Sequence, residues 1–337
     1  MMNTLVCTAP GELVLEQRPR PVPAEGEVLV RIRRVGVCGT DMHIFRGTQP
    51  YLAYPRIMGH ELAGEVVSAP AGVDLAPGEA VYIMPYMSCG HCSACRKDKP
   101  NCCRNIQVLG VHVDGGLAEY LCVPAGFVGK ATGLSLDEAA MVEFLAIGAH
   151  AVRRAQIKPG QSVLVVGAGP IGIAAALFAK LAGGVVTALD GRRDRLDFCA
   201  EHIGVDHTVD LGPDTARELG VLTEGDFFDV VFDATGNPKA MEAGFAYVGH
   251  GGAYVLISVV SADITFSDPE FHKRETTLLA SRNATLEDFE MVVDTIRAGK
   301  APTRALNTHS GRLADLPTDL PHWMEPAAGV IKAIVSC

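Results

Sequence analysis

The sequence predicts an α/β protein made of two parts, a β-rich region with antiparallel strands and a parallel sheet covered by helices on both faces. The length of 337 residues suggests about two domains. From residue 27 to about 125 the apolar segments are short, β-branched and interrupted by glycine. After Pro159 and Gly160, apolar strands alternate with helical segments, which is the pattern of a parallel sheet.

The composition excludes several classes of protein. Apolar residues make up 48% of the chain and charged residues 20%, so we do not expect disorder. No apolar run reaches the roughly 18 residues of a membrane span, and the first ten residues lack the pattern of a secretory signal. The formal net charge of −10 argues against a broad nucleic-acid surface. We therefore expect a cytoplasmic protein without a nucleic-acid or membrane partner.

Four short segments predict the antiparallel strands of the β-rich part. They are residues 27–39 (EVLVRIRRVGVCG), 64–70 (GEVVSAP), 78–84 (GEAVYIM) and 118–124 (AEYLCVP). The stretch from Ser135 to Ala155 is helical in pattern, because Ser135 can cap it and Asp137 and Glu138 suit its first turn.

Three segments predict the parallel sheet. Residues 162–190 form a strand, a glycine turn, a helix and a second strand, and residues 227–236 and 253–258 supply further buried strands. The alternation is lost from about Ser281, and the chain ends in a short apolar run, residues 329–335 (GVIKAIV).

A glycine-rich turn after the strand at residues 163–166 predicts a dinucleotide site. Gly167 suits the tight turn, Gly169 lets the backbone approach a pyrophosphate, and Gly172 lets helix and strand pack closely. Asp190 ends the next strand and suits a ribose 2′-hydroxyl, which favours NAD over NADP. The arginines that follow, 192 and 193, could serve a 2′-phosphate or be solvated, and they leave the choice open.

A cluster of cysteines predicts a structural zinc site. Cys89, Cys92, Cys95 and Cys103 have the spacing C-x2-C-x2-C-x7-C, which lets one loop place four sulfurs around a tetrahedral ion. In a cytoplasmic chain of this size such clustering indicates metal binding rather than disulfides. The neighbouring Cys102 could substitute for Cys103.

Cys38, His60 and Glu143 are candidate ligands of a catalytic zinc, which takes about three protein ligands and keeps one position open. One thiolate and one carboxylate would neutralise the ion and leave it a useful Lewis acid. Each residue alone has a plainer interpretation, as a small buried cysteine, a core histidine and a charge on a helix surface.

The order of these motifs along the chain is typical of a known family. GVCGTDMH, GHELAGEV, the four-cysteine loop and GAGPIG occur here in the order seen in zinc-containing medium-chain alcohol dehydrogenases, and the chain resembles that family over essentially its whole length. The resemblance implies a β-rich GroES-like catalytic domain into which a Rossmann domain, a doubly wound parallel sheet, is inserted. We expect the catalytic zinc domain at 1–145 and 282–337 and the NAD-binding domain at 146–281.

The resemblance also implies residue roles. Thr40 and His43 match the hydroxyl and imidazole through which the substrate proton leaves, by way of the cofactor ribose, and Asp41 matches the residue that orients the site. The predicted catalytic residues are Thr40, Asp41, His43 and Glu61. The predicted metal ligands are Cys38, His60, Glu61, Glu143, Cys89, Cys92, Cys95 and Cys103. The predicted cofactor-binding residues are Gly167, Gly169, Pro170, Ile171, Gly172, Asp190, Arg195, Thr235, Gly236, Ile257 and Ser258.

Two points of the resemblance stay open. Either Glu61 or Glu143 could be the resting carboxylate ligand of the zinc. The family usually has proline after the metal-site glutamate, and Phe144 stands there in this chain, which puts the local turn in question.

Residues 54–61 and 266–289 are similar to bacterial dehydrogenases that act on L-galactonate or L-gulonate at C5, within a wider likeness to polyol and threonine dehydrogenases. This likeness implies NAD-linked oxidation of a secondary alcohol of a sugar acid or polyol. The predicted substrate residues are Arg282, Asn283 and Lys273, with Arg46 and His272 as further candidates to hold a carboxylate.

Other functions compete with this interpretation. An L-threonine 3-dehydrogenase shares the zinc motifs but needs an acceptor for the substrate ammonium, which we cannot identify. A catalytically silent NAD(H)-binding regulator predicts lost ligands or relay residues, and all are present. A zinc-free quinone reductase is disfavoured by Cys38, His60 and the cysteine loop. The family implies a homodimer or homotetramer, and we expect the tetramer.

Overall fold

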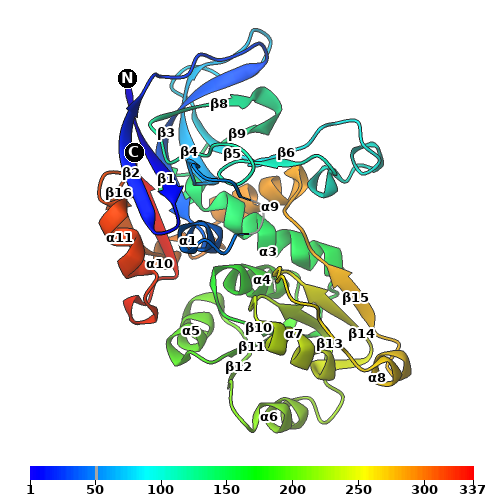
Figure 1. The fold of residues 1–337 in the computed structure, drawn as a ribbon. Helices are drawn as coiled ribbons and strands as arrows, with labels where there is room; N and C mark the ends of the chain where they lie inside the picture. The colour runs from blue at the N-terminus through cyan, green and yellow to red at the C-terminus, as the bar shows by residue number, and fades with distance from the viewer. Residues whose placement is uncertain (50–51) are drawn as a thin grey trace. The chain divides into compact units, whose positions relative to one another are not determined.

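The computed structural model describes residues 1–49 and 52–337, which separate into two compact units. The first unit is Met1–Phe144 with Ala284–Cys337, and the second is Leu145–Asn283. Figure 1 shows the strands and helices of both units along the chain.

Among the described residues, the first unit holds a seven-stranded sheet in the order β16-β17-β3-β4-β5-β9, with β8 paired to β3. The pairs around β3 and β4 are antiparallel, which confirms the predicted β-rich region. The pair β16–β17 is parallel. Helix α11 lies between these two strands in sequence and supplies the crossover that a parallel pair needs.

The elements of the first unit are short. Its strands are β1 (Met2–Ala9), β2 (Glu12–Arg18), β3 (Glu27–Val37), β4 (Glu61–Ser68), β5 (Ala80–Ile83), β6 (Tyr86–Met87), β7 (Gln107–Val108), β8 (Tyr120–Pro124), β9 (Val128–Lys130), β16 (Asn307–Arg312) and β17 (Lys332–Ser336). Its helices are α1 (Gly39–Arg46), α2 (Leu136–Ala140), α9 (Leu286–Arg297), α10 (Thr303–Leu306) and α11 (Leu316–Trp323), and α3 (Val142–Ala155) begins in it.

The core of the first unit is formed by the inward side chains of its sheet. Val30, Ile32 and Val35 of β3 pack in one cluster with Leu62 of β4 and Ile83 of β5. Apolar residues that alternate along these strands thus bury one face, as the pattern predicts.

The second unit is a six-stranded sheet in the order β12-β11-β10-β13-β14-β15, and every neighbouring pair is parallel. Its strands are β10 (Ser162–Val166), β11 (Val185–Asp190), β12 (His207–Asp210), β13 (Phe228–Asp233), β14 (Val248–Leu256) and β15 (Thr277–Ala280). Its helices are the rest of α3, α4 (Pro170–Leu181), α5 (Arg193–Phe198), α6 (Thr215–Leu222), α7 (Pro238–Gly244) and α8 (Asp268–Lys273). This confirms the predicted doubly wound sheet.

The strand order of the sheet reverses at β10, since β11 and β12 lie on one side of it and β13 to β15 on the other. Ligands of such sheets bind where the strand order reverses, at the carboxyl ends of the strands. The topology therefore puts the candidate cofactor site beside the turn that follows β10.

The predicted helix from Ser135 to Ala155 differs from the observed structure. Ser135 and Glu138 form the expected capping box, but the helix breaks at Met141, which ends α2 before α3 begins. The amide of Met141 bonds to the carbonyl of Glu138, three residues back, and this tighter turn interrupts the α-helical ladder. Glu143 consequently lies in the first turn of a new helix.

No helix within the described part of the chain is long and apolar enough to cross a membrane.

Candidate functional site

Cys38, His60 and Glu61 come together at adjacent strand ends of the first unit. Cys38 follows β3 and is the N-cap residue of α1, while His60 and Glu61 lie where β4 begins. Strands β3 and β4 are antiparallel neighbours, with Gly36 opposite Glu61, so the end of one meets the start of the other. One ligand atom from each of the three residues lies within 4.8 Å of the others.

Asp41 holds the two loops that carry the cysteine and the histidine. Its carboxylate accepts hydrogen bonds from the backbone N–H of Cys38 at 2.9 Å and of Gly59 at 3.1 Å. The same carboxylate lies 3.9 Å from Nδ1 of His60. Asp41 is 2% exposed, so these bonds compensate for the burial of its charge.

Glu61 lies opposite Gly36 of the neighbouring strand and forms an ion pair with the buried Lys332. A Cβ atom on Gly36 would stand 2.1 Å from Oε2 of Glu61, so only glycine leaves room for this carboxylate. Lys332 Nζ contacts both carboxylate oxygens, at 2.6 and 2.7 Å. Neither side chain is more than 2% exposed.

Lys332 reaches this position from β17, the last strand along the chain, which lies between β16 and β3 in the sheet. It also donates to the carbonyl of Val37 at 3.2 Å, and its ammonium lies 4.4 Å from the ring centroid of Phe144. Sequence reasoning did not select Lys332, although it is the one charged residue in the apolar run at 329–335. A charge within such a run is a signal that could have found it, because a buried ion needs a partner.

Glu143 lies beside the three clustered donors without belonging to their 4.8 Å group. It is 4% exposed and accepts a hydrogen bond from the hydroxyl of Tyr86, a second residue that sequence reasoning missed. Burial raises the pKa of Glu143 to about 7, with His60 and the Tyr86 hydroxyl acting in the opposite direction.

The chemistry of these donors fits a zinc ion. A thiol, an imidazole and carboxylates are the groups that zinc takes in catalytic sites. Nδ1 of His60 is buried and has no hydrogen-bond partner among the described residues. Burial alone would lower the pKa of His60, but the negative charges of Cys38 and Asp41 outweigh it and raise that pKa well above its usual value. The same negative surroundings would stabilise a bound cation.

Thr40 and His43 lie three residues apart on α1, so the helix presents them on neighbouring positions of one face. Thr40 is half-buried and His43 is exposed. Nδ1 of His43 lies 3.0 Å from the hydroxyl oxygen of Thr48. Arg46, one of the further candidates for binding a carboxylate, is in the last turn of the same helix.

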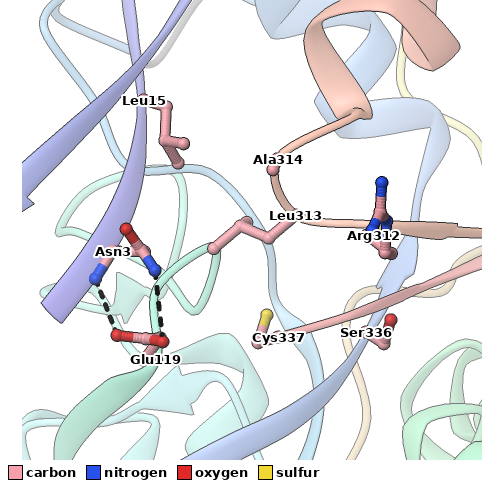
Figure 2. A pocket seen from close by; sticks show the side chains of 8 residues that line it. All are labelled: Asn3, Leu15, Glu119, Arg312, Leu313, Ala314, Ser336 and Cys337. Atoms are coloured by element: carbon pink, nitrogen blue, oxygen red, sulfur yellow. Dashed lines mark hydrogen bonds between the residues drawn. The ribbon is translucent and has the colours of Figure 1, made fainter.

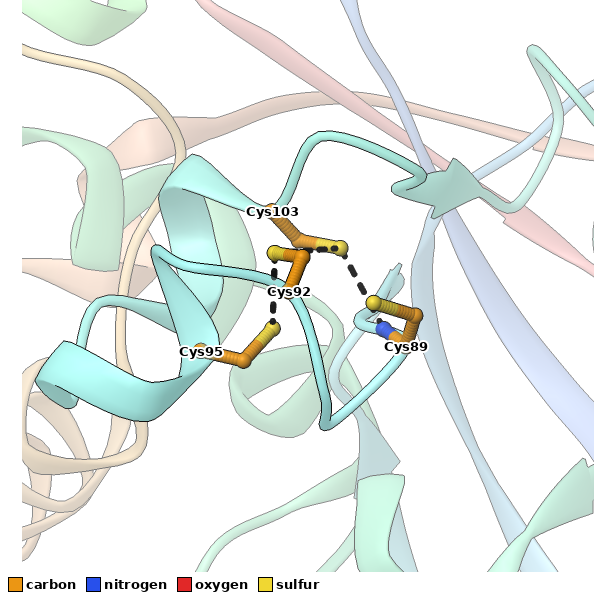
Figure 3. A group of neighbouring side chains, drawn as sticks. All are labelled: Cys89, Cys92, Cys95 and Cys103. Atoms are coloured by element: carbon orange, nitrogen blue, oxygen red, sulfur yellow. Dashed lines mark hydrogen bonds between the residues drawn. The ribbon is translucent and has the colours of Figure 1, made fainter.

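The four predicted cysteines of the loop form a second group of sulfurs. The Sγ atoms of Cys89, Cys92, Cys95 and Cys103 all lie within 4.8 Å of one another (Figure 3). Cys92 Sγ is 3.5 Å from that of Cys95 and 3.9 Å from that of Cys103. Cys102 is exposed and stays outside the group.

Backbone amides of the loop point at the sulfurs. The amide of Cys89 donates to Cys103 Sγ at 3.3 Å. Hydrogen bonds from the backbone of Cys95 and Arg104 lower the pKa of the Cys92 thiol to about 5. These contacts favour the thiolate form of Cys92, which is the form that binds a metal. Burial instead raises the pKa of the Cys95 thiol to about 11.

In the second unit the glycine turn has the geometry expected of a phosphate-binding turn. Gly167 has a φ of +95°, which favours glycine. A Cβ atom on Gly172 would lie 1.7 Å from the carbonyl oxygen of Gly167, so a side chain there would disrupt the turn. Gly169 is the N-cap of α4, and Pro170 and Ile171 begin it. The free N–H groups of this helix start can receive an anion.

Asp190, at the end of β11, is hydrogen-bonded to the same glycine turn. Its carboxylate accepts from the amide of Ala168 at 2.6 Å and from that of Arg192 at 2.8 Å. The Arg192 guanidinium is paired with Asp194 at 2.7 Å, and Arg193 with Asp197 at 2.8 Å. Arg195 is buried on α5, at 7% exposure.

Asp233 organises the carboxyl ends of β13 and β14. Its carboxylate accepts from the amide and the hydroxyl of Thr235, both at 3.0 Å, and its carbonyl accepts from the amides of Ile257 and Ser258. Burial raises the pKa of Asp233 to about 6. Gly236 has a φ of +61°, and a Cβ atom there would lie 3.9 Å from the side chain of Ser258. These predicted cofactor residues therefore lie together.

The predicted substrate residues belong to the second unit. Arg282 is exposed and Asn283 is half-buried with a φ of +53°. Lys273 is exposed at the end of α8, next to the exposed His272, and its ammonium lies 3.7 Å from Glu270.

Two open hollows contain none of the candidate residues. One of about 310 Å³ in the first unit is lined by Asn3, Leu15, Glu119, Arg312, Leu313, Ala314, Ser336 and Cys337 (Figure 2). Another of about 650 Å³ in the second unit lies at the amino ends of the strands, beside Ser162 and Phe228. Neither hollow is lined by the clustered donors or by the glycine turn.

Comparison with known families matches both parts of the chain. The family model of the alcohol dehydrogenase GroES-like domain matches residues 24–133. The model of the zinc-binding dehydrogenase family matches residues 170–298.

Two relatives illustrate the similarity. The L-galactonate-5-dehydrogenase of Escherichia coli (strain K12) is 43% identical over 94% of this chain and 93% of that protein. The L-threonine 3-dehydrogenase of Pyrococcus horikoshii is 34% identical over 78% of each chain.

Solved structures agree over the full length. A structure from E. coli CFT073, described as a short chain alcohol dehydrogenase with cofactor NADH, superposes with a TM-score of 0.93 at 29% identity and covers 100% of this chain and 99% of that one. A Sinorhizobium meliloti 1021 structure bound to NADP superposes with a TM-score of 0.92 at 27% identity, with the same coverage. The chain belongs to the zinc-binding alcohol dehydrogenase family and is an oxidoreductase of the medium-chain type.

Proposed function

We propose that this protein is a zinc-dependent, NAD-linked dehydrogenase that oxidises the secondary alcohol of a sugar acid, with L-galactonate or L-gulonate at C5 as the expected substrates. The observation that carries the proposal is the complete donor group, with Cys38, His60 and Glu61 within 4.8 Å of one another, in a chain 43% identical to an L-galactonate-5-dehydrogenase.

Two zinc sites follow from the donors. Cys38 and His60, with Glu61 or Glu143, would hold the catalytic ion, and Cys89, Cys92, Cys95 and Cys103 the structural one. The catalytic zinc would act as a Lewis acid that lowers the pKa of the substrate hydroxyl. The charges would balance, because the doubly charged ion and the Lys332 ammonium offset one thiolate and two carboxylates.

The chain's own residues would position the donors and move the proton. Asp41 fixes the backbone of Cys38 and Gly59 and so keeps the cysteine and histidine loops together. Thr40 would accept the proton of the substrate hydroxyl, and His43 would receive that proton and release it to water. A bound nicotinamide cofactor would supply the hydride acceptor for oxidation of the alcohol to a ketone.

The cofactor would bind at the glycine turn, with its pyrophosphate at the start of α4 and its ribose hydroxyl at Asp190. Arg195, Thr235, Gly236, Ile257 and Ser258 would complete the site. NAD is favoured over NADP because Arg192 and Arg193 are already engaged by carboxylates, which would repel a 2′-phosphate.

Arg282, Asn283 and Lys273 are the proposed contacts of the substrate. A guanidinium can hold a carboxylate by two parallel hydrogen bonds, so Arg282 is the stronger candidate. We expect Arg282→Leu to raise KM for an aldonate about tenfold or more and to spare an uncharged polyol, since a charge-assisted pair contributes roughly 1.5–3 kcal/mol.

The decisive experiment follows NADH at 340 nm with L-galactonate, L-gulonate, D-sorbitol, galactitol and L-threonine. A higher kcat/KM for an aldonate than for its polyol supports the sugar-acid assignment. Equal or better turnover of the polyols would contradict it, and activity on threonine alone would replace it with the threonine reaction. Repeating the panel with NADP tests the cofactor choice.

The number of zinc ions is tested by metal analysis of the purified chain. We expect two zinc ions per chain and one in Cys92→Ser. Cys102→Ser is the matched control, because this exposed thiol lies outside the sulfur group and its loss should leave two. Two ions in Cys92→Ser would contradict the structural site.

The remaining assignments concern the domain limits, the oligomeric state and the cellular location. The limits 1–145 with 282–337 for the catalytic zinc domain and 146–281 for the NAD-binding domain lie within two residues of the compact units. We propose a cytoplasmic homotetramer in carbohydrate metabolism, with the homodimer as the alternative, and light scattering of the purified protein separates these two assemblies.

A further inference from the structure

The end of helix α1 folds back onto His43. The helix ends at Gly47, whose φ of +76° is the left-handed conformation that favours glycine. The amide of the next residue, Thr48, then donates to the carbonyl of His43 at 2.9 Å. This cap places the Thr48 side chain beside the imidazole of the same helix.

Among the described residues, the Thr48 hydroxyl has two hydrogen-bond partners, both on His43. Its oxygen lies 3.0 Å from Nδ1 and 3.3 Å from the carbonyl oxygen. The carbonyl can only accept, and it already accepts from the Thr48 amide at 2.9 Å. The hydroxyl donates to the same oxygen at 3.3 Å, which leaves the hydroxyl oxygen to accept from Nδ1–H. Nε2 has no hydrogen-bond partner among the described residues, and the ring is exposed.

We propose that Thr48 is a positioning residue that fixes His43 in the Nδ1–H tautomer and so keeps Nε2 bare to accept the substrate proton. The hydrogen bond at one ring nitrogen decides which nitrogen carries the proton in neutral imidazole. This inference rests on the proposed role of His43 as the end of the proton relay.

The arrangement keeps the same bonds through the whole proton transfer. The incoming proton binds the lone pair of Nε2 and gives an imidazolium, while Nδ1 keeps its own proton and its bond to Thr48. Release of the Nε2 proton to water restores the starting tautomer. The hydroxyl never has to rotate, so the transfer needs no reorganisation at this end of the helix.

The test measures the tautomer and the rate separately in the full-length protein. ¹⁵N-histidine labelling distinguishes a protonated from a bare ring nitrogen, and the His43→Gln variant assigns the signals. We expect neutral His43 to be Nδ1–H in the wild type and to move towards Nε2–H, the form free histidine favours, in Thr48→Val. The single-turnover rate of NADH formation should fall about tenfold in Thr48→Val, a fraction of what a general base contributes.

Two variants separate the hydroxyl from a structural effect. Thr48→Ser keeps the hydroxyl and should restore both readouts. Thr295→Val on α9 removes a hydroxyl that also donates to a backbone carbonyl but touches no histidine, and it should leave both unchanged. An Nε2–H tautomer in the wild type would overturn the proposal, as would a tautomer change without a change in rate. If the wild type turns over no substrate, the proposed function fails while the tautomer measurement still tests the Thr48 contact.

Discussion

Buried carboxylates occur in both units, but they are compensated differently. In the first unit Glu61 is in direct contact with the Lys332 ammonium, at 2.6 Å. In the second unit the carboxylate of Asp233 has an N–H and a hydroxyl of Thr235 as its partners. Both residues are 0% exposed, so water compensates neither charge.

The difference shows which carboxylates have a partner that keeps them ionised. An ion pair lets a carboxylate stay charged in the interior, whereas hydrogen bonds alone compensate only part of the desolvation. Burial raises the pKa of Asp233 to about 6 accordingly. Glu143, whose hydrogen bond comes from Tyr86, has a pKa raised by burial to about 7. The donor group of the first unit thus holds the negative charge of Glu61 beside the Lys332 ammonium.

Removal of the thiol should have the largest effect if that negative charge serves a metal cation. We expect Cys38→Ser to lower kcat/KM by about 1,000-fold, because Lewis-acid stabilisation contributes several kcal/mol, and to lose one zinc per chain. Cys122→Ser, at a half-buried thiol on β8 outside both groups, is the control. Full turnover of Cys38→Ser without metal would show that the donor group is structural.

Breaking the ion pair tests the fixed cation itself. We expect Lys332→Met to lower the free energy of unfolding by about 3–5 kcal/mol, because it leaves the Glu61 charge buried and unpaired. The double variant Lys332→Met, Glu61→Gln should regain most of this loss in urea unfolding.

The ion pairs of Lys130 with the exposed Asp74 and the half-buried Glu79, which lie closer to solvent, provide the comparison for that loss. Lys130→Met should cost less than about 1 kcal/mol, as surface ion pairs do. Similar costs for the two lysines would mean that burial of the Glu61 pair has no special weight.

Local motifs explain why much of the site could be predicted from sequence. The four sulfurs come from one loop, and the glycine turn, its strand and its helix are consecutive, so spacing alone constrains them. The fold class was predictable for the same reason, since the periodicity of short segments distinguishes the antiparallel from the parallel strands.

Contacts between distant segments explain what could not be predicted. Lys332 meets Glu61 only because β17 pairs with β3, and no local pattern encodes that pairing. Tyr86 reaches Glu143 from a two-residue strand. The break at Met141 lies within a continuous helical pattern, which therefore did not reveal it.

The pH dependence of stability tests the carboxylate without a cation. The pKa of Asp233 is raised by burial, so folding is penalised above about pH 6 and the penalty disappears as pH falls towards 4. We expect Asp233→Asn to raise the free energy of unfolding at pH 7.5 by up to about 3 kcal/mol, with the gain vanishing near pH 4. Asp229→Asn, at an exposed residue of the same strand, is the control. A gain independent of pH would contradict the assignment.

The smallest effect should come from Tyr86, which compensates Glu143 with a hydroxyl rather than a cation. Tyr86→Phe keeps the ring against Phe289 and removes one donor, so we expect a loss of about 1–2 kcal/mol in urea unfolding. Tyr82 stacks on the same Phe289 ring at 5.8 Å, and Tyr82→Phe is therefore the matched control, with a smaller loss. If both variants lose the same stability, the ring and not the bond to Glu143 is what matters. A loss as large as that of Lys332→Met would mean that a single hydroxyl compensates a buried carboxylate as well as an ammonium does, and the contrast between the two kinds of site would fail.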